Sequence, residues 1–131
     1  MSTREVEGRI MVVDDEASVR KVTGMLLEEV GYEVATYADA ESALAAFEAE
    51  PGAFTAVLTD LTLPRVDGIA LARRLKAIRQ TVPVLLTSGS IETSARDLAE
   101  VDEILLKPCG IEELRSGLER AIANAKSAAG P

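Results

Sequence analysis

Histidine is absent from the 131 residues of the sequence. Without imidazole the chain cannot build a Ser-His-Asp hydrolase site or a His-ligated zinc site, and it cannot phosphorylate a histidine of its own. Any chemistry must therefore rest on carboxylates, hydroxyls, lysine and arginine.

Cysteine and long apolar runs are also scarce. Cys109 is the single cysteine, so no disulfide can form within the chain, and a reducing compartment fits this usage. No apolar run approaches the ~20 residues that a membrane span needs, and no signal peptide is visible. These absences predict a cytoplasmic protein.

Positive charge and aromatic residues are limited as well. The 14 basic residues are outnumbered by 22 acidic ones, which gives a net charge of −8. This balance argues against direct binding to nucleic acid or to anionic membranes, both of which favour a basic face. Aromatics make up only 3% of the chain, so the core must consist mostly of Val, Leu, Ile and Ala.

Strand and helix patterns alternate along the chain. A length of 131 residues suits one domain, and we expect a leader over 1–8, a folded domain over 9–126 and a disordered tail over 127–131. Short apolar runs predict strands, and apolar residues at helical spacing predict the helices between them. The predicted strands are 9–14, 32–37, 54–60, 82–89 and 101–108. The predicted helices are 16–30, 39–50, 69–79, 111–125 and a weak, short helix over 90–100.

Five βα units predict an α/β fold with a parallel sheet and helices on both faces. Right-handed crossovers favour a flavodoxin-like, doubly wound (βα)5 sheet in the strand order 2-1-3-4-5. Ligands of such sheets bind beyond the carboxyl ends of the strands, near the switch point between the first and third strands.

Polar residues gather at those carboxyl ends. Asp14 and Asp15 follow the first strand, Asp60 ends the third, Ser88 lies at the end of the fourth beside another hydroxyl residue, and Lys107 ends the fifth. The predicted topology directs these side chains into one crevice.

Three carboxylates in one crevice need charge compensation. Two of them ~5 Å apart repel by roughly 3 kcal/mol at an effective dielectric constant of ~20. A raised pKa on one acid could relieve this repulsion, but a divalent cation relieves it better, and a few oxygen ligands completed by water suit Mg²⁺. A lysine and a hydroxyl nearby can bind phosphoryl oxygens, so the set fits phosphoryl transfer to a carboxylate.

Four segments carry a family resemblance: "VVDDE", "LTDLTLPRVDG", "PVLLTSG" and "ILLKP". In this order and spacing the chain resembles the receiver domain of two-component response regulators, over 9–125. The resemblance also extends to the receivers fused to hybrid sensor histidine kinases, and a stand-alone regulator is the alternative.

The resemblance implies a role for each site residue. Asp60 is the phosphoacceptor, while Asp14, Asp15, Asp60 and the backbone carbonyl of Thr62 bind Mg²⁺. Ser88 is the switch hydroxyl, Lys107 is the site lysine, and the bond from Lys107 to Pro108 is cis. Ile104 stands at a switch position that is often aromatic in the family, and Cys109 replaces a common phenylalanine.

The implied function is a phosphoacceptor signalling domain rather than an enzyme. The phosphoryl donor is a histidine kinase or a histidine phosphotransfer protein in trans, and the output is a downstream protein target. A pseudo-receiver that is never phosphorylated is the alternative. The adjacent acids Asp14 and Asp15 argue against an aspartate-nucleophile phosphatase, which needs Asp-x-Asp after the first strand. The three acids there would repel a flavin phosphate, which argues against flavin binding.

Simpler explanations exist for individual residues. Asp14 and Asp15 could cap the first helix, Asp60 could start a turn, and Lys107 could be a solvated surface lysine. Asp67 and Gly68 are interpreted as a turn and the entry to a helix.

Overall fold

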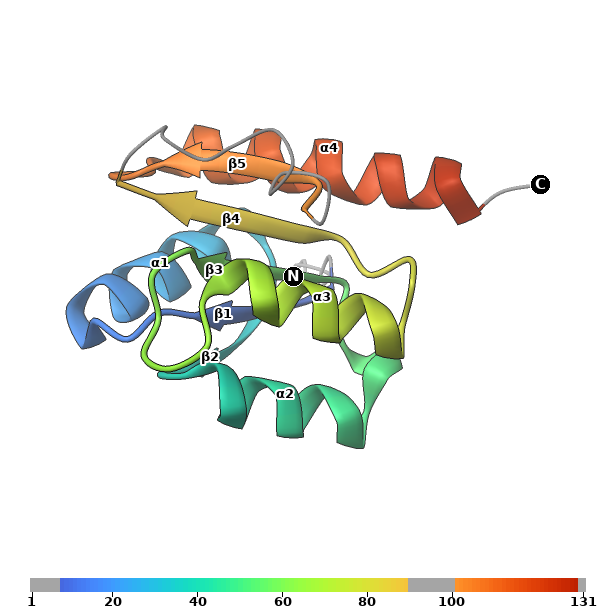
Figure 1. Cartoon of the computed structure of the whole chain (residues 1–131). Helices are drawn as coiled ribbons and strands as arrows, with labels where there is room; N and C mark the ends of the chain where they lie inside the picture. The colour runs from blue at the N-terminus through green and yellow to red at the C-terminus, as the bar shows by residue number, and fades with distance from the viewer. Residues whose placement is uncertain (1–7, 90–100, 130–131) are drawn as a thin grey trace.

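The computed structural model describes residues 8–89 and 101–129. Within these ranges, five parallel strands form one sheet in the order β2-β1-β3-β4-β5, which confirms the predicted doubly wound topology (Figure 1). The helix predicted over 90–100 lies outside the described residues. The elements are β1 (Arg9–Val13), α1 (Ala17–Val30), β2 (Glu33–Tyr37), α2 (Ala40–Ala49), the short 3-10 helix η1 (Pro51–Ala53), β3 (Ala56–Asp60), α3 (Gly68–Ile78), β4 (Val84–Ser88), β5 (Glu103–Leu106) and α4 (Ile111–Ala129).

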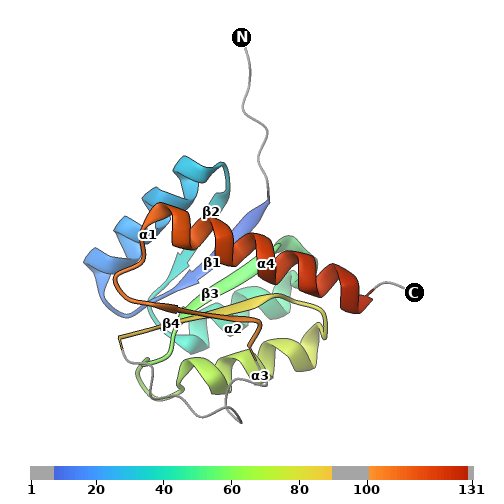
Figure 2. The ribbon, with the colours of Figure 1, turned by 90° about the horizontal axis from the view of Figure 1, so that it is seen from above.

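Two apolar layers bury the sheet, one on each face. Side chains alternate along a strand, so Ile10 and Val12 of β1 face α1 and α4, whereas Met11 and Val13 face α2 and α3. The views in Figures 1 and 2 show the same division of the helices between the two faces. Because β1 is buried on both sides, it reads as a continuous apolar run.

Local signals fix where the helices begin and end. The Asp39 carboxylate accepts a hydrogen bond from the Ser42 N–H at 2.7 Å, and the Asp67 carboxylate accepts one from the Ala70 N–H at 2.8 Å. Both aspartates are therefore N-caps, as expected for Asp67 at a helix entry. Gly31 ends α1 with a φ of 123°, a conformation that glycine adopts without steric cost.

One expectation from the sequence is wrong. Helix α4 continues to Ala129, past the predicted end at 125, and so includes part of the predicted tail. The last turns of this helix are rich in alanine, the strongest helix former, and they contain no glycine or proline. Two residues at apolar helical spacing, Ile78 and Val22, are 38% and 55% exposed. Leu75 and Val82 fill the core near the end of α3, and Val22 borders an open groove.

Candidate functional site

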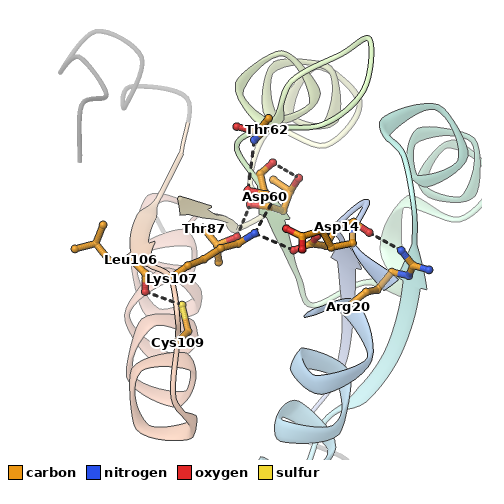
Figure 3. Close-up of polar contacts among 10 residues, drawn as sticks. Asp14, Arg20, Asp60, Thr62, Thr87, Leu106, Lys107 and Cys109 are labelled. Atoms are coloured by element: carbon orange, nitrogen blue, oxygen red, sulfur yellow. Dashed lines mark hydrogen bonds and ion pairs between the residues drawn. The ribbon is translucent and has the colours of Figure 1, made fainter. Parts of the chain in front are cut away.

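The carboxyl edge of the sheet brings together side chains from three strands. Asp14 follows β1 directly, Asp60 is the last residue of β3, and Lys107 follows β5. Since β1 pairs with β3, and β4 lies between β3 and β5, the parallel register places all three at one end of the sheet. Figure 3 shows the Lys107 side chain reaching toward the two carboxylates.

Lys107 bridges the two buried acids. Its Nζ donates to Asp60 Oδ2 at 2.9 Å and to Asp14 Oδ2 at 3.2 Å. Burial alone would lower the pKa of Lys107, but the hydrogen bonds to Asp60 and Asp14 outweigh it and raise this pKa above its ordinary value. Lys107 is therefore a charged internal partner of the site and not a solvated surface lysine.

The acids still outnumber their internal cation. Carboxylate oxygens of Asp14, Asp15 and Asp60 lie within 4.8 Å of one another. Asp14 and Asp60 are buried, at 4% and 7% exposure, whereas Asp15 is exposed to solvent. One lysine among three carboxylates leaves an excess of negative charge at this edge of the sheet. Oxygen donors in this number, open to water on one side, fit Mg²⁺.

The acids after β1 do not cap α1. Glu16 is the N-cap residue of this helix, and its side chain makes no capping hydrogen bond. Asp14 Oδ1 accepts from the Glu16 N–H at 2.9 Å, which stabilises the turn before the helix, while its other oxygen faces Lys107. The capping explanation therefore does not account for Asp14 and Asp15.

The loop after β3 is held close to Asp60. The Thr62 N–H points to Asp60 Oδ1 at a long 3.4 Å, and the Leu61 N–H donates to the Thr87 carbonyl at 2.8 Å. Gly68 closes this loop: a Cβ there would lie 2.4 Å from the Asp60 carbonyl oxygen. Thr62 is thus beside the acceptor, and its carbonyl as a metal ligand stays a prediction.

The two hydroxyl residues at the end of β4 are both buried. Thr87 pairs with Asp60 in the sheet register, and Ser88 pairs with Leu106. The Ser88 carbonyl accepts from the Lys107 N–H at 2.9 Å, so the backbone of Ser88 also anchors the lysine. The switch role of Ser88 stays a prediction, as does that of Ile104, which is half-buried in β5 opposite Leu86.

A groove of about 490 Å³ opens beside the acids, between α1 and the segment after β5. Apolar side chains dominate its lining, which includes Val19, Val22, Leu26 and Pro108. Cys109 also lines the groove and is half-buried, less than a core position would be. The peptide bond between Lys107 and Pro108 is cis, as the resemblance implies.

The sequence interpretation missed one residue that touches the site. The Arg20 guanidinium donates from Nη1 to the Asp14 carbonyl oxygen at 2.7 Å (Figure 3). A basic residue in the first turns of α1, after a run of acids, is the signal that could have pointed to this contact.

Comparison with known proteins places this geometry in a family. Residues 10–119 match the family model of the response regulator receiver domain. The transcriptional regulatory protein FixJ of Bradyrhizobium diazoefficiens is 35% identical over 128 residues, which cover 94% of this chain and 60% of FixJ. The chain therefore spans less than two thirds of that relative.

Two solved structures are similar over most of the chain. A response regulator receiver domain protein from Clostridium thermocellum has a TM-score of 0.85 at 27% identity, covering 92% of this chain and 98% of that one. The receiver domain of the sensor histidine kinase PA1611 from Pseudomonas aeruginosa, with a magnesium ion coordinated in its active site cleft, has a TM-score of 0.79 at 27% identity, covering 88% and 98%. In the described part of this chain, each helix is too short or too polar to cross a membrane.

Proposed function

Because the chain belongs to the response regulator receiver domains of two-component signalling, we propose that it accepts a phosphoryl group on Asp60 with the help of Mg²⁺. The observation that carries this proposal is the Lys107 ammonium held between Asp60 and Asp14, at 2.9 and 3.2 Å, beside the exposed carboxylate of Asp15. A nucleophilic carboxylate, two further acids and a lysine are the groups that phosphoryl transfer to an aspartate needs.

The donor is a phosphohistidine on a separate protein, because this chain contains no histidine. An Asp60 carboxylate oxygen forms a bond to phosphorus while the bond from phosphorus to the histidine nitrogen breaks, and its electron pair returns to the imidazole. Lys107, already 2.9 Å from Asp60, stabilises the negative charge on the phosphoryl oxygens. Asp14, Asp15, Asp60 and the Thr62 carbonyl would hold Mg²⁺, which would supply further neutralisation of that charge.

The acyl phosphate then shifts the domain between two states. We propose that the Ser88 hydroxyl donates to a phosphoryl oxygen and that Ile104 follows it by repacking in β5. The two residues lie on neighbouring strands, and the backbone bond from the Lys107 N–H to the Ser88 carbonyl links the loops after β4 and β5.

The partners we propose are proteins. A histidine kinase or a histidine phosphotransfer protein supplies the phosphoryl group, and a downstream protein receives the signal in the cytoplasm. FixJ is named a transcriptional regulator, but this acidic segment spans only part of its length. Since a net charge of −8 is unfavourable for binding DNA, we propose no contact between this segment and DNA. The similar structure from Pseudomonas is the receiver domain of a sensor histidine kinase. A stand-alone regulator and a receiver of a hybrid kinase are therefore the two alternatives for this chain.

Intact-mass analysis with acetyl phosphate tests the proposal. We expect a gain of one phosphoryl group that needs Mg²⁺, is removed by hydroxylamine as an acyl phosphate would be, and is absent in Asp60→Asn. The matched control is Asp67→Asn, which alters another acid of the same loop, an N-cap of α3.

The outcomes separate the alternatives. Phosphorylation of Asp60→Asn would contradict the assigned acceptor. Phosphorylation of the wild type at the same rate with and without Mg²⁺ would contradict the metal site. A wild type that gains no phosphoryl group from acetyl phosphate or from a phosphorylated histidine protein would make the chain a pseudo-receiver.

A further inference from the structure

We propose that Arg20 is a positioning residue that fixes Asp14 for binding of a divalent cation, an inference that rests on the proposed Mg²⁺ site. Arg20 lies in the first turns of α1, where its N–H donates to the Glu16 carbonyl at 2.9 Å. From there its half-buried guanidinium reaches back to the end of β1 and donates to the Asp14 carbonyl at 2.7 Å. Figure 3 shows it approaching Asp14 from the side opposite Lys107.

Every polar group of Asp14 has a partner. Its N–H donates to the Tyr37 carbonyl at 3.1 Å, and its Oδ1 accepts from the Glu16 N–H at 2.9 Å. Its Oδ2 accepts from Lys107 at 3.2 Å, and its carbonyl accepts from Arg20 at 2.7 Å. The Arg20 contact, with a charged donor, is the shortest of the four.

The four contacts respond differently to a cation. A divalent ion bound by the Asp14 carboxylate would compete with Lys107, which already donates to Asp14 Oδ2. The bond from Arg20 goes to the backbone carbonyl and is free of this competition. Arg20 can therefore keep the Asp14 backbone in place while the carboxylate exchanges one cation for another, as supporting residues around metal ligands do.

Charge and hydrogen bonding predict opposite effects when Arg20 is removed. Losing a positive charge beside three acids should by itself tighten Mg²⁺ binding. Losing the hydrogen bond should loosen Asp14 and weaken Mg²⁺ binding. The sign of the change therefore shows which effect dominates, and the proposal requires weaker binding.

Mg²⁺ titrations followed by NMR amide shifts provide the test. We expect Arg20→Met to raise the dissociation constant of Mg²⁺ about tenfold. Arg20→Lys, which retains a charged donor of similar reach, should recover most of the affinity. The matched control is Lys21→Met, which removes the same charge from the neighbouring, exposed position of α1 and should leave the affinity unchanged or slightly higher.

Thermal unfolding in EDTA distinguishes positioning from general stabilisation. A merely structural Arg20 would lower the melting temperature of Arg20→Met without changing its Mg²⁺ affinity, which would overturn the proposal. Mg²⁺ binding by Arg20→Met as tight as in the wild type, or tighter, would do the same. A wild type that binds no Mg²⁺ would overturn the metal site itself, a failure distinct from that of Arg20.

Discussion

Two lysines join secondary-structure elements at opposite ends of the sheet, and their surroundings differ in charge balance. Lys76 of α3 donates to Asp102 Oδ2 at 2.9 Å and to the Val82 carbonyl at 3.0 Å, and the same carboxylate oxygen accepts from the Val84 N–H at 2.7 Å. At the carboxyl edge, Lys107 contacts two carboxylates and a third lies beside them.

The pair at the amino edge is complete by itself. One ammonium faces one carboxylate, both partners are about four-fifths buried, and backbone groups occupy further hydrogen-bonding positions. The carboxyl edge has the same kind of lysine but an excess of acids. A balanced ion pair leaves no net charge for a ligand, whereas an excess of carboxylates gains from a further cation, and this difference separates a structural contact from a binding site.

The largest expected effects come from removing each lysine in turn. Lys107→Met should slow phosphorylation by acetyl phosphate about 100-fold or more, because it removes a charge aimed at the phosphoryl group. Lys76→Met should leave that rate nearly unchanged. Both variants should lose about 2 kcal/mol of unfolding free energy in EDTA. Lys76→Met leaves the Asp102 carboxylate without its charged partner, and Lys107→Met leaves those of Asp14 and Asp60 without theirs.

Added Mg²⁺ should break the similarity between these two variants. Saturating Mg²⁺ should restore most of the stability of Lys107→Met, because the cation replaces the lost charge, and little of that of Lys76→Met. Urea denaturation with and without Mg²⁺ measures both values. Equal recovery of the two variants would contradict a difference in charge balance between the two ends of the sheet.

The contrast also shows what a sequence can reveal. Asp14, Asp60 and Lys107 could be predicted to meet because each follows or ends a strand, and parallel strands share one carboxyl edge. The contact between Lys76 and Asp102 could not, because it joins a helix to the residue before β5, and no periodic pattern relates these positions. Strand ends are ordered by topology, while side-chain reach from a helix depends on packing.

The exposure of apolar helix residues and the ends of helices also depend on packing that the sequence pattern does not show. Val22 belongs to the apolar stripe of α1, yet its side chain is exposed to the groove. Helix periodicity predicts which residues share a face, but it does not predict how much of that face other elements bury. The end of α4 was placed too early because its alanines carry no periodic signal. The roles predicted for Ser88 and Ile104 depend on a bound phosphoryl group, and that of the Thr62 carbonyl depends on a bound Mg²⁺, so these roles stay predictions.

A smaller effect on the free energy of unfolding should distinguish alanine substitutions at two buried glycines, one beside Asp60 and one away from it. Gly68→Ala should cost about 1–3 kcal/mol, because the new Cβ would lie 2.4 Å from the Asp60 carbonyl and force the loop to move. Gly24 of α1 is its control, since a Cβ there would meet Val34 Cγ1 at an ordinary 3.6 Å. Gly24→Ala should instead stabilise the protein by about 0.4–1 kcal/mol.

Chemical denaturation of both glycine variants, with their phosphorylation rates, gives the comparison. Gly68→Ala should also phosphorylate more slowly because the acceptor shifts, while Gly24→Ala should phosphorylate at the wild-type rate. Stabilisation by Gly68→Ala would show that the loop after β3 is not packed against Asp60 as described.

The smallest expected effect is an alkaline loss of stability at Lys107. Burial opposes the charged form of this lysine, but its bonds to Asp60 and Asp14 raise its pKa in the folded protein above the ordinary value of 10.5. The folded state therefore holds the proton more tightly than the unfolded state does. The resulting stabilisation is fully present below pH 10.5 and is lost as the pH rises through the folded pKa. Other groups titrate in the same range, so unfolding free energies of wild type and Lys107→Met should be compared from pH 8 upward in EDTA. The gap between them should narrow with rising pH, and a constant gap would mean that the charge of Lys107 does not stabilise the metal-free site.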